Sequence, residues 1–394
     1  MRRIAVTAAT ALLLTVAAFG QDRYRSLLPT DEAVGRHGLV RKWYAFAPVD
    51  GVREKIERAA VVGTQVHLQT NASRVHVLDG ESGKLLWSAQ MGVPVPGQYG
   101  SAINSKSVYV INGSRLYRLN REDGSQLWSI KLPQAANTAP AADEERVMVS
   151  TVDGRVYVFD QDTHKVIWFY QSGGTISMPA LLLDDKIACA SQDGVMYVFQ
   201  TSSRNPTLRY QTDAPVSAPL GAWGRTVLVP SQDYHLYSVD VRSGALMWRY
   251  SAGGPIYRPV TVIDDDVFVV PDELGLHLVN AESGERKWLN PRAADFVVAS
   301  AGRVYAADKI GQLLVLDRAS GRLVSQWDTH QFDFRVRNDA NDRLYLATAN
   351  GLVVCLHEKA NKQPLEHKKA LPPPPAGRDE KRKPAGKAAG VVAP

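Results

Sequence analysis

Several kinds of chemical feature are scarce in this chain of 394 residues. It has only two cysteines, Cys189 and Cys355, so at most one disulfide could form. The Gly-x-Ser-x-Gly, His-Glu-x-x-His and phosphate-loop motifs are absent, which removes the usual signatures of esterases, zinc proteases and nucleotide-binding enzymes. The nine histidines show no paired metal-ligand spacing. His67 and His76 fall on opposite strands of one predicted hairpin, and we expect both on the surface.

Long apolar runs are almost missing as well. The one clear run, residues 4–18, follows two arginines and is short for a membrane span. Ala18-Phe19-Gly20 then forms a small-x-small cleavage site, so residues 1–20 are predicted to be a signal peptide rather than a membrane anchor. The next residue is Gln21 and not cysteine, which argues against a lipid anchor there. We therefore expect export across the inner membrane, a periplasmic or envelope location, and no transmembrane segment in the mature chain.

Net charge is confined to the two ends of the chain. The total is +6, of which residues 1–20 contribute +2 and residues 358–394 contribute +5, so the body between them sums to −1. A neutral body does not predict a nucleic-acid surface. Residues 359–394 are rich in Pro, Lys and Ala and are expected to be disordered. This basic tail is interpreted as a solvated linker, with a peripheral contact to the cell wall or an anionic membrane as the alternative.

The most abundant feature of the chain is a sequence repeat of about forty residues that occurs eight times. Each copy contains a short strand, a tight turn and a strand of alternating apolar and polar residues. In most copies Asp or Asn follows, with Gly four residues later and Trp four residues after that. The residue that ends the alternating strand is Asp79, Asn120, Asp160, Gln200, Asp240, Asn280, Asp317 and His357 in turn. A period near forty residues built from short strands is typical of β-propeller blades. The predicted fold class is therefore all-β, an eight-bladed β-propeller with four-stranded antiparallel blades.

Three recurring positions have a structural interpretation. Glycine in the turn supplies a positive φ, and the turns that instead carry His164, Arg204 or Asn361 are expected to differ or to be strained. The tryptophans are expected to wedge between neighbouring blades, with Leu208 taking the place in the fourth repeat. A Pro preceded by small or polar residues recurs at the expected innermost strand, where it would line the hub. The recurrences are 138–140, 177–179, 217–219 and 257–259.

The eighth repeat lacks its fourth strand, and the missing strand occurs near the N-terminus. Residues 39–45 resemble the Trp strand of the fifth repeat, and Trp43 precedes Trp87 by 44 residues, close to one period. We predict that residues 38–47 close the ring by pairing with residues 352–357, which removes an open sheet edge. The two cysteines then lie four blades apart, too far for a disulfide, and are expected to be unpaired and buried. The predicted division is a lead segment, a propeller and a tail, at residues 21–37, 38–358 and 359–394.

The repeat phrases resemble those of the pyrroloquinoline-quinone-like β-propeller family. The phrases VDGRVYVFDQDTHKVIW and GQLLVLDRASGRLV carry the likeness, which extends over about residues 38–357. In blade number, length and export the chain is similar to the propeller subunits of the bacterial outer-membrane β-barrel assembly machine. This resemblance implies a non-catalytic scaffold that binds another envelope protein and uses no cofactor.

Two other functions stay open beside the scaffold. One is a quinoprotein dehydrogenase, a class that resembles this repeat and holds pyrroloquinoline quinone and Ca²⁺, commonly under a disulfide between adjacent cysteines. No two cysteines are adjacent here, and there are no long insertions between repeats, so we favour the scaffold. The second alternative is a propeller that binds the cell wall or a carbohydrate.

Five residues are candidates for a binding site at the mouth of the channel. They are charged or aromatic residues that the pattern assigns to innermost strands: Tyr99, Tyr257, Arg258, Arg335 and Arg337. Internal salt bridges with nearby acids are the equally open alternative for the arginines. The acidic runs at 264–266 and 339–342 precede hairpin strands, so turn chemistry explains them better than Ca²⁺ binding. No catalytic residue and no metal site is expected.

Overall fold

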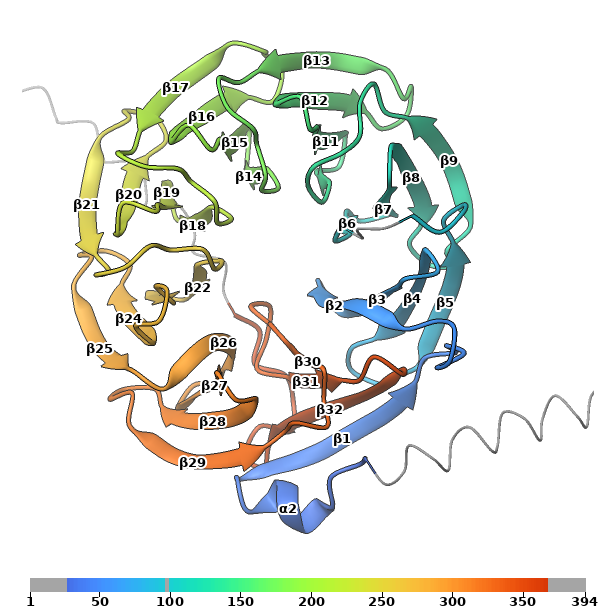
Figure 1. Ribbon diagram of the computed structural model, residues 1–394, viewed down its shortest axis with the longest axis vertical. Helices are drawn as coiled ribbons and strands as arrows, with labels where there is room; N and C mark the ends of the chain where they lie inside the picture. The colour runs from blue at the N-terminus through green and yellow to red at the C-terminus, as the bar shows by residue number, and fades with distance from the viewer. Residues whose placement is uncertain (1–26, 96–98, 368–394) are drawn as a thin grey trace, which may run out of the picture.

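The computed structural model describes residues 27–95 and 99–367. Eight antiparallel sheets of four strands, called blades here, form a ring with the first strand of each blade near the centre and the fourth on the rim (Figure 1). The predicted eight-bladed, all-β propeller is confirmed. Blade numbers follow the repeats along the chain.

Blades 1 to 4 occupy the first half of the ring. Blade 1 contains β2 (Ile56–Val62), β3 (Gln65–Thr70), β4 (Arg74–Asp79) and β5 (Leu85–Gln90). Blade 2 contains β6 (Ala102–Ile103), β7 (Ser107–Asn112), β8 (Arg115–Asn120) and β9 (Gln126–Lys131). Blade 3 contains β10 (Ala141–Ala142), β11 (Arg146–Ser150), β12 (Arg155–Asp160) and β13 (Val166–Gln171). Blade 4 contains β14 (Leu181–Leu183), β15 (Lys186–Ala190), β16 (Val195–Gln200) and β17 (Pro206–Gln211).

Blades 5 to 8 complete the ring. Blade 5 contains β18 (Gly221–Trp223), β19 (Thr226–Pro230), β20 (His235–Asp240) and β21 (Leu246–Ser251). Blade 6 contains β22 (Thr261–Ile263), β23 (Asp266–Val269), β24 (Leu276–Asn280) and β25 (Arg286–Asn290). Blade 7 contains β26 (Ala293–Ala299), β27 (Arg303–Asp308), β28 (Gln312–Asp317) and β29 (Leu323–Asp328). Blade 8 contains β30 (Phe334–Val336), β31 (Leu344–Ala347), β32 (Leu352–Glu358) and β1 (Leu39–Phe46).

The two ends of the chain close the ring, as predicted. β1 pairs antiparallel with β32, from Leu39 opposite Glu358 to Phe46 opposite Leu352. The short helix α2 (Asp31–Gly35) precedes β1 and lies outside the ring beside blade 8 (Figure 1). N-terminal and C-terminal residues therefore share one sheet, and the last blade has no missing strand.

Antiparallel order gives the disc two different faces. The connections between blades, and those joining the second and third strands of a blade, leave from one face, which we call the loop face. The hairpins joining first and second strands, and the Asp/Asn turns joining third and fourth strands, leave from the opposite face, the turn face. Because β1 begins and β32 ends at the turn face, the chain enters and leaves blade 8 on that side.

The tryptophans connect neighbouring blades, as the repeat predicts. Each of six indole Nε1–H groups donates to a backbone carbonyl in the next blade, that of the residue directly after the Asp/Asn position. The donor tryptophans are Trp43, Trp87, Trp128, Trp168, Trp248 and Trp288, at 2.8–3.0 Å. Four of the turn glycines lie against the indole of the preceding blade, where an added Cβ would come within 2.4–2.7 Å of the ring. Glycine is therefore needed at these turns for space as well as for its φ near +70°.

The turns without glycine differ, as expected. His164 adopts a φ of 61° and its ring lies 4.8 Å from that of Trp128. Arg204 and Asn361 are not among the described residues with positive φ, so their turns take another shape. Cys189 and Cys355 are buried and unpaired, as predicted.

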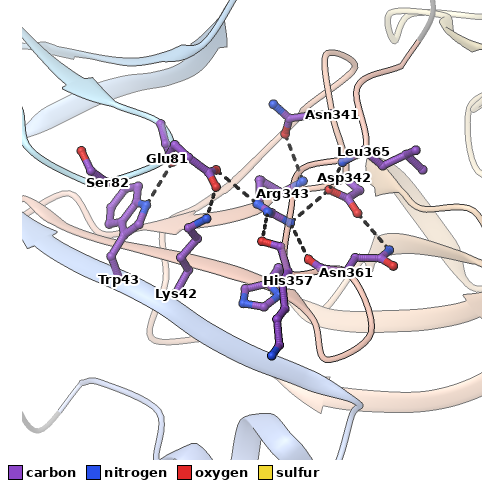
Figure 2. Close-up of polar contacts among 12 residues, drawn as sticks. Lys42, Trp43, Glu81, Ser82, Asn341, Asp342, Arg343, His357, Asn361 and Leu365 are labelled. Atoms are coloured by element: carbon purple, nitrogen blue, oxygen red, sulfur yellow. Dashed lines mark hydrogen bonds and ion pairs between the residues drawn. The ribbon is translucent and has the colours of Figure 1, made fainter.

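The seam between blades 8 and 1 contains a buried charge cluster around Arg343. The side chain of Arg343 has no exposed surface, and its Nη1 donates to the Asp342 carboxylate at 3.2 Å. Its Nε lies 3.4 Å from the carboxylate of Glu81 in blade 1, and Glu81 also pairs with Lys42 of β1 (Figure 2). Strands from both ends of the chain and the first blade therefore meet at one guanidinium.

The segment after β32 completes this cluster. Arg343 also donates to the carbonyls of Asn361 and Lys362 at 3.1 and 2.8 Å. The Asp342 carboxylate accepts hydrogen bonds from the Leu365 amide and the Asn361 side chain, each at 3.0 Å (Figure 2). Residues 359–367, which the sequence assigned to the tail, are thus held against blade 8. The remainder of the expected tail and the predicted signal peptide lie outside the described residues.

Two local expectations are wrong. The Pro motifs, such as 138–140 and 177–179, do not form the innermost strands. They directly precede them, and β10 and β14 begin one or two residues after the proline. His67 and His76 are buried and not on the surface. Both faces of a propeller strand pack against neighbouring blades, so a polar residue in an alternating strand is covered from either side.

Candidate functional site

The site lies on the loop face near the centre of the ring, where blades 6, 7 and 8 meet. A cavity of about 550 Å³ opens there, and we call it the mouth cavity. Three of the five predicted site residues line it: Arg258, Arg335 and Arg337. Acidic residues and one lysine form much of the remaining charged lining: Asp272, Glu273, Asp295, Asp308, Lys309 and Asp333.

The mouth cavity has a cause in the chain length of the repeats. Only residues 291–292 connect β25 to β26, whereas nine residues connect β21 to β22. This short connection matches the one shortened step in the repeat, 37 residues from Asn280 to Asp317. The loop that would extend over the hub at this position is therefore missing, and the side chains of the neighbouring loops border the resulting space.

Two arginines share one carboxylate in the mouth cavity. Asp295 of β26 accepts a hydrogen bond from Arg337 Nη2 at 3.1 Å, and its other oxygen lies 3.2 Å from Arg258 Nη1. Arg337 is further held by the Pro259 carbonyl at 2.7 Å and by the ring of Phe296, 6.0 Å from its guanidinium carbon. Both arginines therefore pair with an internal acid, the alternative that the sequence left open.

Arg258 keeps free hydrogen-bonding capacity. Its side chain is 48% exposed, and it makes no hydrogen bond to the part of the chain that the structure describes. A guanidinium has five N–H donors in a fixed plane and suits a carboxylate or phosphate. Arg258 is therefore the cation of the mouth cavity best placed to meet a partner group.

Arg335 is used by the fold itself. Its Nε donates to the Thr329 hydroxyl at 2.9 Å, and its Nη2 donates to the carbonyls of Gly311 and Thr329 at 2.6 and 2.8 Å. Burial lowers the pKa of Arg335 from its ordinary value, against the opposing effect of nearby carboxylates such as Asp308. It remains a cation that ties the start of blade 8 to blade 7.

The two tyrosines lie elsewhere. Tyr257 is 48% exposed in the loop before β22, next to Arg258 in sequence. Tyr99 is half-buried and packs against the apolar cluster between blades 2 and 3, away from the mouth cavity. The innermost-strand assignment is right only for Arg335, which lies in β30, whereas the other four candidates lie in loops beside innermost strands.

Sequence reasoning missed the acidic half of the mouth cavity. Asp295 and Asp308 belong to blade 7 and Asp272 to a loop of blade 6, and none falls at a recurring position of the repeat. The 37-residue step could have indicated this site in the sequence, because a shortened connection between blades leaves the side chains of the neighbouring loops uncovered.

The described residues that line the mouth cavity offer charged and apolar side chains for contacts with a bound group. No group of three or more His, Cys, Asp or Glu among them is arranged to hold a metal ion. Within residues 27–95 and 99–367, no helix is long and apolar enough to cross a membrane.

A family model matches the chain at residues 71–212 and 204–343, and its description is outer membrane protein assembly factor BamB. The chain belongs to this family of PQQ-like propellers. A search of curated protein sequences gave no match. The predicted resemblance to the assembly-machine propellers is confirmed at the level of family and fold.

Solved structures agree on the architecture. BamB from Moraxella catarrhalis is 17% identical with a TM-score of 0.66, and the match covers 82% of this chain and 98% of that one. The quinohemoprotein alcohol dehydrogenase from Comamonas testosteroni is 11% identical with a TM-score of 0.62, and the match covers 87% and 78% of the two chains. The computationally designed Ika8 protein has a TM-score of 0.65 at 16% identity, over 78% and 98%. At these identities the likeness concerns the fold alone.

Proposed function

We propose that this propeller is a non-catalytic scaffold of the cell envelope and that it binds another protein through its loop face. Membership of the BamB family supports an envelope role. The observation that carries the choice of face is the distribution of exposed large apolar side chains between the two faces of the disc.

Outside the outer strands, the exposed large apolar side chains lie mainly on the loop face. Seven of its connections carry one each: Val52, Val93, Val152, Tyr234, Tyr257, Leu274 and Ile310. Val52 and Val93 are 84% and 74% exposed, and Ile310 is 63% exposed. Among the described hairpins, turns and chain ends of the turn face, only Leu365 is comparable, at 40%. Large apolar side chains that are exposed on one face can be buried by a protein partner, and this burial favours association.

The mouth cavity adds specificity to this surface. The apolar residues surround a centre where Arg258 and several carboxylates are exposed to solvent. A partner would bury its apolar anchors against the loops and pair its charges with those of the cavity, which favours one orientation. A rigid ring is suited to this because its loops vary without altering the scaffold.

Binding to envelope extracts tests the proposal with matched variants. The loop-face variant combines Val52→Ser and Ile310→Ser, and the turn-face control is Leu365→Ser. A third protein ends at residue 367 and so lacks the rest of the basic tail. We expect the loop-face variant to lose recovery of its envelope partner at least about tenfold, since two buried apolar anchors are removed. The control and the shortened protein should bind like the parent.

Two results would contradict the proposal. Binding that disappears with the tail, and weakens strongly at high salt, would assign the interaction to a basic tether. Dye reduction on alcohols or aldoses after addition of pyrroloquinoline quinone and Ca²⁺ would instead place the protein among the quinoprotein dehydrogenases.

A further inference from the structure

Blade 3 has an outer edge that lacks the usual protection. The fourth strand of every blade ends its sheet, so one side of its backbone has no strand to pair with. Natural edges are commonly protected by charged residues or proline, which discourage pairing with another chain. Six of the eight outer strands have such residues: Arg41 and Lys42, Lys131, Pro206 and Arg209, Arg249, Arg286 and Lys287, and Asp328. The exceptions are β5 and β13.

β13 is the more apolar of these two edges. Val166, Ile167 and Phe169 are 42%, 44% and 46% exposed, whereas β5 exposes only Leu85 and Leu86. No other outer strand in the described ring has three exposed large apolar side chains. At the position of Phe169, one residue after the tryptophan position, blades 1, 2, 4 and 5 have Ser or Arg, whereas blades 6 and 8 have Leu289 and Tyr44. The edge therefore combines free backbone groups with an apolar surface.

Cations surround this edge. The guanidinium carbon of Arg155 lies 5.6 Å from the centre of the Phe169 ring. Arg209 of blade 4 donates to the Tyr170 hydroxyl at 3.0 Å, and Lys165 is exposed directly before the strand. The acids near this edge already have partners, since Asp153 pairs with Arg155 at 3.3 Å and Asp162, in the turn before the strand, pairs with Arg118 at 3.2 Å. Asp160 accepts hydrogen bonds from Thr163 within that turn. An acidic segment is therefore favoured over a basic one.

We propose that β13 binds an extended segment of a partner protein by adding it to blade 3 as a fifth strand. The segment would have apolar residues at alternate positions, to cover Ile167 and Phe169, and acidic residues near its ends, to meet Lys165 and Arg209. Its backbone would satisfy the free N–H and C=O groups of β13. This site is on the rim, whereas the proposed function uses the loop face, so the two are separate (Figure 1).

A synthetic peptide of alternating valine and threonine between terminal aspartates tests this site on the full-length protein. We expect the peptide to bind and to slow hydrogen exchange at alternate amides of 166–171. An N-methylated peptide, which cannot form the ladder, should bind at least about tenfold more weakly. Phe169→Lys should weaken binding by a similar factor, whereas Met247→Lys, on the exposed surface of β21, should not change it. Both variants should keep the parent's melting temperature.

Other results would overturn the inference. These are no binding up to about 1 mM peptide, equal binding of the methylated peptide, or protection confined to another strand. Concentration-dependent dimerisation that Phe169→Lys abolishes would show that a second copy of the chain occupies the edge instead. The loop-face variant should bind the peptide normally, which separates failure of this inference from failure of the proposed function.

Discussion

The turn face and the loop face are formed by the same eight repeats, yet they differ in regularity. On the turn face, one pattern of Asp/Asn turn, glycine and tryptophan recurs around the ring, and the chain ends meet at Arg343. On the loop face, connections vary in length, seven expose an apolar side chain, and one is short enough to open the mouth cavity. Substitutions at the recurring positions and at the closing seam of the turn face should therefore change stability, and those at exposed residues of the loop face should change binding.

Removing residues 21–47 should have the largest effect on stability. The deletion takes away β1, exposes the edge of β32 and uncovers the apolar cluster around Tyr345 and Cys355. We expect the free energy of unfolding to fall by more than about 5 kcal/mol, since several buried side chains including Trp43 are lost. Chemical denaturation measures the change, and an unaltered unfolding curve would show that β1 does not close the ring.

Arg343→Met should be the most damaging single substitution at the closing seam. It leaves the carboxylate of Asp342 buried without its cation and frees the carbonyls of Asn361 and Lys362. Removing one partner of a buried ion pair costs about 3–5 kcal/mol. Arg322→Met, on an exposed arginine of the turn face, is the control and should change stability by less than about 0.5 kcal/mol. Equal effects of the two would mean that the cluster does not stabilise the closure.

Gly284→Ala tests an ordinary seam. The residue has a φ of 73°, and a Cβ would come within 2.7 Å of the Trp248 ring. We expect a loss of about 2 kcal/mol from backbone strain and displacement of the indole. Gly302→Ala is the matched control, because a Cβ there meets nothing within 4 Å and no positive φ is required. A loss no larger than that of the control would contradict the proposed contact between turn and indole.

Mild acid should lower the stability of the fold through two buried histidines. Burial lowers the pKa of His76 and of His277 from 6.5 to about 4. The unfolded chain takes up these protons below pH 6.5 while the folded protein does not, so stability is full above pH 6.5 and declines toward pH 4. Each histidine should contribute a slope of up to about 1.4 kcal/mol per pH unit. Denaturation at pH 7 and pH 5 should show a smaller decline for His277→Gln than for the parent.

The ring could be predicted because its contacts repeat. The spacing from Asp79 to Gly83 and Trp87 predicts the turn, its glycine and the tryptophan that packs between blades. The position of Trp43 indicates which segment supplies the last strand of blade 8. Contacts that occur once could not be read in this way. Arg343 is held in part by the carbonyls of residues 361 and 362, and this segment has the composition of a linker.

The candidate site could be predicted only in part. Its three arginines were found by their place near the hub, but Asp295 belongs to the one blade whose connection is short. Alternating strands also suggested exposed positions for His67 and His76, which neighbouring blades cover. Packing between blades determines whether such a side chain is buried, and the sequence pattern of a single strand does not reveal this packing.

Site-specific photo-crosslinking in cells that make the protein tests the central claim most directly. A photoreactive amino acid is placed at Val52, Ile310 and Tyr257 on the loop face, and at Lys84, Glu122 and Glu282 on the turn face. All six positions are exposed or at turn tips, so the substitutions should leave the melting temperature unchanged. The account predicts that the three loop-face positions crosslink to the same envelope protein and that the turn-face positions do not. Crosslinks from the turn face alone would contradict it.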